Sequence, residues 1–292
     1  MQFTFVILNY NTFDDTKKCI ESIRSLNLNT NINYNIIVVD NASTDNSGKK
    51  IKEKFNQQDI ETILLEQNVG FSKGNNIGYK EAVRRYKSDF IILLNSDTEI
   101  PENDFYKIIM KRFKNVGFGV LGPNVYNPIT NTNQSPFYEN KNIDINFVNK
   151  QIFKNKIHLV RINIQRRIPT FTNYIYKIIK RQKKGNNLFK ESNNDACIHG
   201  CFMVFSRNFI NIFPDGLYDK TFMYGEEDIL YYLCKKNNII EYYDSKLKIY
   251  HYEEKSSKNS FSDQYEAQKF KYNNLLKSLS ILKELVTSYD GR

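Results

Sequence analysis

The sequence lacks several features that would place it in a class at once. It has no tryptophan, and its four cysteines are too few and too scattered for the disulfide framework of a small secreted domain. No stretch approaches the roughly 18 to 20 uncharged apolar residues of a membrane-spanning helix. Residues 1–4 lack the basic n-region of a signal peptide. We therefore expect a protein that stays in the cytoplasm with reduced cysteines.

Two common ligand-binding signatures are also missing. Gly70, Gly74 and Gly78 are spaced as G-x3-G-x3-G, which is neither the dinucleotide fingerprint nor the Walker loop. The C-x-H-x-C stretch at residues 197–201 has no second Cys/His pair at ligand spacing to complete four zinc ligands. We interpret the cysteines as small buried apolar residues.

Acidic residues are absent from residues 145–190, which carry twelve Lys or Arg. Because the whole chain has a net charge of +10, the residues outside this segment together have a net charge of −2. Apolar side chains are interleaved with these basic ones. Such a segment is compatible with a solvated insertion, with contact to an anionic bilayer surface, or with nucleic acid. Nucleic acid is the partner that we expect least.

The composition that remains is that of an ordinary globular protein, with 40% hydrophobic and 25% charged residues in 292. Apolar runs that predict strands recur about every 30 residues, at 3–8, 36–39, 60–65 and 90–94. Helical patterns separate them, one starting at Thr12 and one covering about 72–86. The alternation predicts an α/β fold with a parallel sheet and right-handed crossovers. Pro101 predicts the first turn of the following helix.

Small polar residues follow each predicted strand. Asn95, Ser96 and Asp97 come directly after the run at 90–94, which is apolar throughout and therefore typical of a strand buried on both faces. Ligands of parallel sheets bind beyond the carboxyl ends of the strands, so Asn95, Asp97 and Thr98 are expected to project into a binding crevice. After the second strand, Asp40 is placed to accept hydrogen bonds from a base or ribose, and Ser43 to meet phosphate. Taken singly, such residues are equally explained as turn and capping residues.

Six elements in a fixed order carry a resemblance to a known family. They are residues 6–11 (VILNYN), 38–45 (VVDNASTD), 68–78 (NVGFSKGNNIG), 94–97 (LNSD), 200–204 (GCFMV) and 222–230 (FMYGEEDIL), followed by His251. With them the chain resembles family 2 glycosyltransferases of the GT-A fold, of the kind related to rhamnosyltransferases and to capsular or O-antigen sugar transferases. The resemblance covers about residues 3–125 and 197–257.

The resemblance implies a Rossmann-like, mostly parallel sheet flanked by helices, with a basic insertion and a C-terminal helical tail. Its parts are a nucleotide-sugar-binding half at 1–125, a basic insertion for membrane or acceptor contact at 126–196, an acceptor and catalytic half at 197–257, and a tail at 258–292. Apolar residues at helical spacing between about 263 and 285 indicate that the tail packs on the domain or on a second subunit.

The resemblance also implies site residues. Those expected to bind the nucleotide sugar are Asn9, Asn11, Asp40, Asn41, Ser43, Asn68, Gly70, Asn75, Asn95 and Ser96. Asp97, with help from His251, would bind Mn²⁺ or Mg²⁺, which suit oxygen ligands and substrate phosphates. Asn95 stands where the family's Asp-x-Asp motif has its first Asp, so this chain brings one charge fewer to the cation.

The catalytic base is expected in Glu226-Glu227-Asp228, which opens a predicted helix reaching residue 236. The family's Glu-Asp pair corresponds to Glu227 and Asp228, with Asp228 preferred as the base, and an alignment shifted by one residue favours Glu227. Acidic residues in a first helical turn are also common as plain partners of the helix dipole.

Together these features predict an enzyme that moves a sugar from a nucleoside diphosphate sugar, UDP or dTDP being favoured, to a hydroxyl of a lipid-linked or cell-surface polysaccharide. We expect it to invert the anomeric carbon, to need a divalent cation, and to act at the inner face of the cytoplasmic membrane. Two alternatives are a sugar-phosphate nucleotidyltransferase and a non-catalytic nucleic-acid-binding protein.

Overall fold

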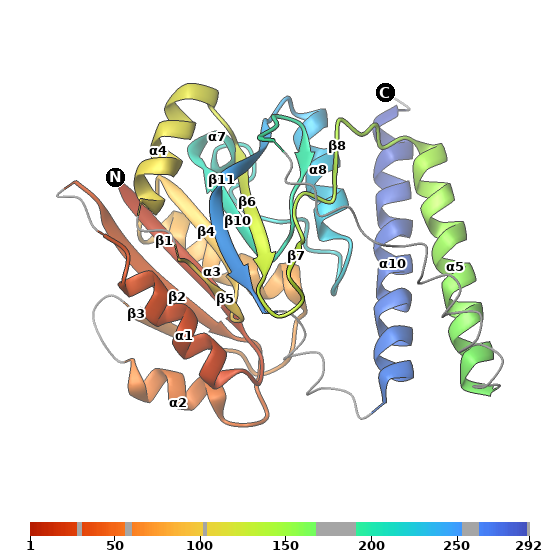
Figure 1. Cartoon of the computed structure of the whole chain (residues 1–292), viewed down its shortest axis with the longest axis horizontal. Coiled ribbons are helices and arrows are strands. Elements are labelled where there is room, and N and C mark those ends of the chain that lie inside the picture. The colour runs from red at the N-terminus through yellow and green to blue at the C-terminus, as the bar shows by residue number, and fades with distance from the viewer. Residues whose placement is uncertain (28–30, 56–59, 102–103, 168–190, 253–262, 291–292) are drawn as a thin grey trace.

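A central sheet with helices on both faces forms the body of the protein (Figure 1). The computed structural model describes residues 1–27, 31–55, 60–101, 104–167, 191–252 and 263–290. Within these ranges the central sheet has nine strands, in the order β3, β2, β1, β4, β10, β6, β11 and β5, and β7 pairs with β6. A separate pair, β8 and β9, lies between the sheet and the helices α5 and α10.

The strands and helices have the following bounds. The strands are β1 (Gln2–Asn9), β2 (Asn33–Asp40), β3 (Ile60–Leu64), β4 (Phe90–Asn95), β5 (Thr98–Glu99), β6 (Val120–Asn127), β7 (Thr132–Asn133), β8 (Tyr138–Glu139), β9 (Ala196–Cys197), β10 (Phe202–Ser206) and β11 (Glu241–His251). The helices are α1 (Phe13–Arg24), α2 (Ser47–Lys54), α3 (Phe71–Arg84), α4 (Phe105–Val116), α5 (Ile145–Arg167), α7 (Arg207–Ile210), α8 (Glu226–Lys236) and α10 (Gln264–Asp290).

The first four strands are parallel, as their spacing predicts. β1 pairs in parallel with β2 on one side and with β4 on the other, and β2 pairs in parallel with β3. Their carboxyl ends therefore meet at one edge of the sheet. β10 then runs antiparallel between β4 and β6, which brings the second half of the chain alongside that edge.

Alternating side chains of the strands divide the core into two layers. Phe5 and Ile7 of β1 pack on the face covered by α1, α2 and α4, whereas Val6 packs on the face covered by α3, α7 and α8. A third cluster joins α8 to α5 and α10 through residues such as Leu279 and Leu282. The described part of the C-terminal tail is thus one long helix that packs on the domain, which confirms the prediction made from its apolar spacing.

Pro101 does not lie in the first turn of α4, which begins at Phe105. The prediction was wrong because a turn at residues 96–97 and the strand β5, which pairs with β11, follow β4 before α4 starts. In the predicted basic insertion, residues 145–167 form α5, and the basic residues between 168 and 190 lie outside the described ranges. None of the helices in those ranges is long and apolar enough to cross a membrane.

One polar contact ties the second half of the chain to α3. The Asn76 side chain donates to the carbonyl of Leu217 at 2.6 Å and accepts the N–H of Leu217 at 2.8 Å. Both residues are buried. Asn76 therefore satisfies both backbone groups of a loop residue that regular secondary structure does not serve.

We expect Asn76→Ala to lower the free energy of unfolding by about 2 to 4 kcal/mol, because it leaves two buried backbone groups of Leu217 unpaired. Urea denaturation measures the loss. Asn115→Ala is the control, since Asn115 is an exposed asparagine in α4 and should change stability by less than about 0.5 kcal/mol. Equal effects of the two substitutions would contradict the role of the contact.

Candidate functional site

The ends of β1 and β2 form a buried hydrogen-bonded network. The Asn9 amide donates to the Asp40 carboxylate at 2.6 Å, and both side chains are buried. The Ser43 hydroxyl also donates to Asp40 at 2.6 Å and accepts the N–H of Asn11 at 2.9 Å. The structure thus brings these four predicted nucleotide-binding residues together, in contact with one another.

Asn41 extends this network to the loop before α3. Its amide donates to Asn68 at 3.0 Å and to the carbonyl of Gly70 at 3.1 Å, and its side-chain oxygen accepts the N–H of Val69. Asn75, one turn into α3, donates to Phe71, and its buried side-chain oxygen has no hydrogen-bond partner in the described part of the chain. The roles of these residues toward a nucleotide stay predictions.

The segment after β4 joins the two halves of the chain. The Asn95 N–H donates to the carbonyl of Cys201 at 2.9 Å, and the Ser96 hydroxyl pairs with that of Thr12 at 2.8 Å. Asp97 Oδ1 lies 3.4 Å from His251 Nε2. This closeness follows from the pairing of β5 with β11, and it brings together the two residues that the sequence assigns to a cation.

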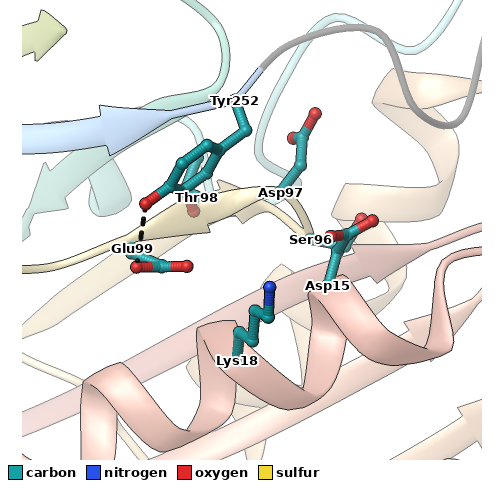
Figure 2. A pocket seen from close by; sticks show the side chains of 7 residues that line it. All are labelled: Asp15, Lys18, Ser96, Asp97, Thr98, Glu99 and Tyr252. Carbon is teal, nitrogen blue, oxygen red and sulfur yellow. Dashed lines mark hydrogen bonds between the residues drawn. The ribbon is translucent and has the colours of Figure 1, made fainter. Parts of the chain in front are cut away.

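A cavity of about 90 Å³ lies beside Asp97 (Figure 2). Its walls come from α1, from the segment after β4 and from the residue after β11, and the lining side chains are Asp15, Lys18, Ser96, Asp97, Thr98, Glu99 and Tyr252. The Tyr252 hydroxyl donates to Glu99 at 3.2 Å. The cavity is smaller than the roughly 300 Å³ or more of sites that enclose an organic ligand, but Asp97 connects it to His251.

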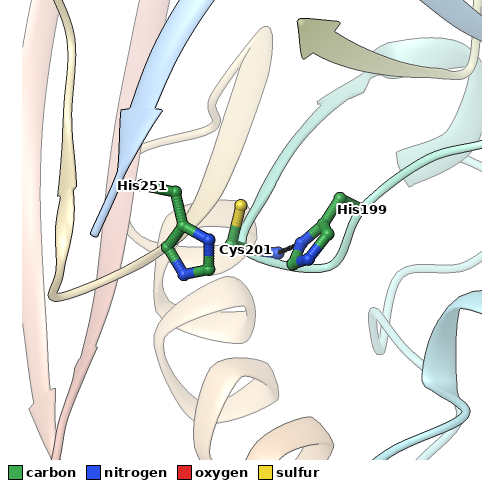
Figure 3. Close-up of side chains that lie close together, drawn as sticks. All are labelled: His199, Cys201 and His251. Atoms are coloured by element: carbon green, nitrogen blue, oxygen red, sulfur yellow. Dashed lines mark hydrogen bonds between the residues drawn. The ribbon is translucent and has the colours of Figure 1, made fainter. Parts of the chain in front are cut away.

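His251 also belongs to a cluster with His199 and Cys201, in which the ligand atoms lie within 4.8 Å of one another (Figure 3). The His251 Nδ1 contacts Gln134 Oε1 at 2.8 Å, which leaves Nε2 facing Asp97. His199 Nδ1 accepts the N–H of Cys201 at 3.0 Å. Sequence reasoning noticed the C-x-H-x-C stretch but missed this cluster, because its third member comes from β11.

The electrostatics of the cluster couple its members. Burial alone raises the pKa of the Cys201 thiol, but the two imidazoles outweigh it and lower the pKa to about 7. Burial alone lowers the pKa of His251, but Cys201 and Asp97 outweigh it and raise the pKa to about 11. Two imidazoles, a thiol and a nearby carboxylate form a donor set that can hold a divalent transition metal.

The first turn of α8 directs its two predicted catalytic carboxylates differently. Glu227 accepts the N–H of Gly200 at 3.2 Å, next to His199 in the chain. Asp228 accepts the Tyr138 hydroxyl at 2.6 Å, on the side of β8. Burial raises the pKa of Asp228 to about 6, with the Tyr138 hydrogen bond opposing and the charge of Glu227 adding to the shift.

Glu226, the third acidic residue of this turn, is buried, and burial raises its pKa to about 8. One of its carboxyl oxygens has no hydrogen-bond partner among the described residues. Immediately before it, Tyr224 and Gly225 both have left-handed backbones, with φ of 70° and 89°. A tyrosine in this region is uncommon, so the entry into α8 is held by its surroundings.

Residues 4–213 match the model of the family described as "Glycosyl transferase family 2". Over 138 residues the chain is 28% identical to "Glycosyltransferase GlyA" of Streptococcus pneumoniae serotype 4, covering 47% of this chain and 18% of that protein. Over 124 residues it is 23% identical to "Low-salt glycan biosynthesis hexosyltransferase Agl10" of Haloferax volcanii, covering 42% and 36%. The aligned segments thus span less than half of either relative.

Solved structures of S. aureus TarS share the fold. TarS 1–349 superposes with a TM-score of 0.53 at 14% identity, covering 86% of this chain and 60% of that one. The complex of TarS 1–349 with UDP-GlcNAc gives a TM-score of 0.54, covering 87% and 59%. At this identity the similarity shows the fold alone, and it confirms the predicted GT-A architecture.

The raised pKa of Asp228 predicts a pH-dependent penalty. The pKa of about 6 in the folded protein lies above the ordinary value of 3.8, so the ionised carboxylate lowers the free energy of unfolding. This loss of stability is complete above about pH 6 and disappears as the pH falls through 6 to below about 4. Asp228→Asn removes this cost, so it should raise the free energy of unfolding relative to the wild type. This difference should be larger at pH 7.5 than at pH 4 by up to about 3 kcal/mol. Denaturant titrations at several pH values measure this.

Asp14→Asn is the control for removal of one negative charge, because Asp14 is exposed at the start of α1. A stability difference between Asp228→Asn and the wild type that is the same at pH 4 and pH 7.5 would contradict the raised pKa.

Proposed function

The chain belongs to glycosyl transferase family 2, and from this premise we propose that it transfers a sugar from a nucleoside diphosphate sugar to an acceptor hydroxyl. The observation that carries the proposal is the meeting of Asp97 and His251, 3.4 Å apart, at the sheet edge where Asn9 and Asp40 also lie. The names of GlyA and Agl10 and the UDP-GlcNAc complex of TarS support a sugar nucleotide, with UDP favoured over dTDP. The acceptor is a lipid-linked or cell-surface polysaccharide of the capsular or O-antigen type, reached from the cytoplasm.

The residues present fit a divalent cation. Asp97 offers a carboxylate oxygen, and the contact of His251 Nδ1 with Gln134 orients Nε2 toward Asp97. When bound there, the cation supplies Lewis-acid stabilisation to the negative charge that develops on the leaving diphosphate. His199 and Cys201 lie close enough to add nitrogen and sulfur donors, which favours Mn²⁺ over Mg²⁺.

Glu227 is the preferred general base in this proposal. Its carboxylate contacts Gly200, beside the cluster that contains His251, whereas Asp228 is engaged by Tyr138 on the other side. Glu227 takes the proton of the acceptor hydroxyl while the new bond to the anomeric carbon forms and the bond to the diphosphate breaks. A single displacement of this kind inverts the anomeric carbon. Asp228, favoured by the sequence, holds Tyr138 and the start of α8 in place.

We expect UDP and the divalent cation to stabilise the folded protein together. UDP with Mn²⁺, at about 100 times its Kd, should raise the free energy of unfolding by about 2.7 kcal/mol, visible as a higher melting temperature. Asp97→Ala should abolish the gain, and His251→Ala should reduce it, because both remove groups that face the cation. Thermal-shift measurements with Mn²⁺, Mg²⁺ or EDTA test this.

Asp215→Ala is the matched control, because Asp215 is 84% exposed and pairs with Lys80 at the surface. It should keep the full response. A wild type that no nucleoside diphosphate stabilises with any of these ions would overturn the proposed function.

The assignment of the base predicts a difference between two adjacent variants. Glu227→Gln should lower kcat by about 10² to 10⁴-fold and leave UDP affinity unchanged, because it removes proton transfer but not donor contacts. Asp228→Asn should lose less. The measurement is UDP release from UDP-GlcNAc and other UDP-sugars. The opposite order of losses would assign the base to Asp228, and full activity of both would exclude this turn from the chemistry.

A further inference from the structure

Helix α5 exposes a row of large apolar side chains. Phe153 is 68% exposed, Ile157 52%, Val160 58% and Ile164 47%. Their spacing of four, three and four residues places all of them on one face of the helix, over three turns. We refer to these four residues as the α5 ridge. Isolated exposed apolar residues are ordinary, but a continuous row marks a contact surface.

The ridge faces away from the other helices and strands of the described ranges. The opposite face of α5 is buried through Val148 and Ile162, and α5 is held against α10 by stacking of His158 on Tyr272 and by an ion pair of Arg166 with Glu266 at 2.6 Å. Figure 1 shows α5 as the outermost helix on the side of α10. The ridge is therefore fixed in orientation and open to a partner.

Basic side chains border the ridge on both sides. Lys154 and Arg161 each follow a ridge residue by one position, which places them on one flank, and Lys156 precedes Ile157, which places it on the other. Lys154 and Lys156 are exposed. Residues 145–167 contain no Asp or Glu. An apolar stripe between two basic flanks is the pattern of helices that lie in the plane of an anionic membrane surface.

We propose that the α5 ridge and its basic flanks bind the surface of an anionic lipid bilayer. The apolar residues enter the boundary between headgroups and acyl chains, and the lysines contact lipid phosphates. A second copy of the chain suits the surface less, because it would bring like charges together, and nucleic acid would leave the apolar row exposed to water. No residue assigned to the donor, the cation or the base belongs to this surface.

The position of the surface agrees with the proposed acceptor but does not depend on it. α10 packs against α8 through Leu279 and Leu282, and α8 carries Glu227 in its first turn. Figure 1 shows α5 and α10 on the side of the molecule opposite to β3. Asp40, at the centre of the predicted nucleotide-binding network, lies in β2 next to β3. Membrane contact at α5 would thus lie on the side of the molecule where α8 carries the proposed base.

The absence of tryptophan makes a direct test possible. Phe153→Trp introduces a single tryptophan, whose emission can be excited apart from that of the 20 tyrosines, into the ridge of the full chain. Its emission should shift to shorter wavelength, and brominated lipid should quench it, when vesicles containing about one third phosphatidylglycerol are added. Ile129→Trp is the control, because Ile129 is 72% exposed outside α5, and its emission should not change.

Vesicle cosedimentation of the full chain then separates the two contributions. Phe153→Ser with Ile157→Ser should weaken binding by about tenfold or more, whereas Ile129→Ser with Ile212→Ser, two other exposed apolar residues, should not. Lys154→Gln with Lys156→Gln should reduce binding and its salt sensitivity more than Lys49→Gln with Lys52→Gln in α2.

Four outcomes would overturn the proposal. They are failure of the wild type to sediment with anionic vesicles, equal binding to phosphatidylcholine alone, equal binding of the ridge variant and its control, and a concentration-dependent dimer that the ridge variant abolishes while vesicle binding is absent. UDP binding, followed by thermal shift in the same samples, reports separately on the proposed reaction. Loss of vesicle binding with UDP binding retained is therefore distinguishable from failure of the enzyme assignment.

Discussion

The hydrogen bonds of the buried Asn9 side chain hold together the sheet edge where the predicted nucleotide-binding residues lie. The side-chain nitrogen of Asn9 donates to the Asp40 carboxylate at the end of β2 and to the hydroxyls of Ser43 and Ser47. Its side-chain oxygen accepts hydrogen bonds from the hydroxyls of Thr12 and Thr16 at the start of α1. Each unmet group there would cost about 1 to 3 kcal/mol. An aspartate could not replace Asn9, because it has no N–H and would face the carboxylate of Asp40. One side chain thus sets the relative positions of two strand ends and two helix starts.

The sequence was sufficient for this edge because local and global signals agree there. Runs such as residues 90–94 are apolar throughout, so they specify strands covered on both faces, and parallel pairing leaves their carboxyl ends at one edge. Polar residues after each run therefore meet without further information. The resemblance to a family added Asp97 and His251, which the pairing of β5 with β11 brings within 3.4 Å.

Long-range geometry explains what the sequence left undecided. The C-x-H-x-C stretch looked incomplete because its third partner, His251, comes from a different strand, and no spacing rule reaches that far. The choice between Glu227 and Asp228 was open for a different reason. Adjacent residues of a helix point about 100° apart, so a shift of one position changes which carboxylate lies beside Gly200 and which meets Tyr138. Only the docking of α8 decides this.

The position of α8 depends on the loop before α3, which belongs to the predicted nucleotide-binding half of the chain. Asn41 holds Gly70, and the N–H of Phe71 donates to the carbonyl of Phe222 at 2.6 Å, a few residues before α8. Gly70 has φ of 86°, and a β-carbon there would lie 2.3 Å from the same carbonyl, so the close approach requires glycine. The loop that leads to Glu227 therefore rests on the loop that Asn41 fixes. Together with the contact of Asn76 with Leu217, this backbone contact holds the proposed base and the predicted nucleotide-binding residues in place relative to one another, although they come from opposite halves of the chain.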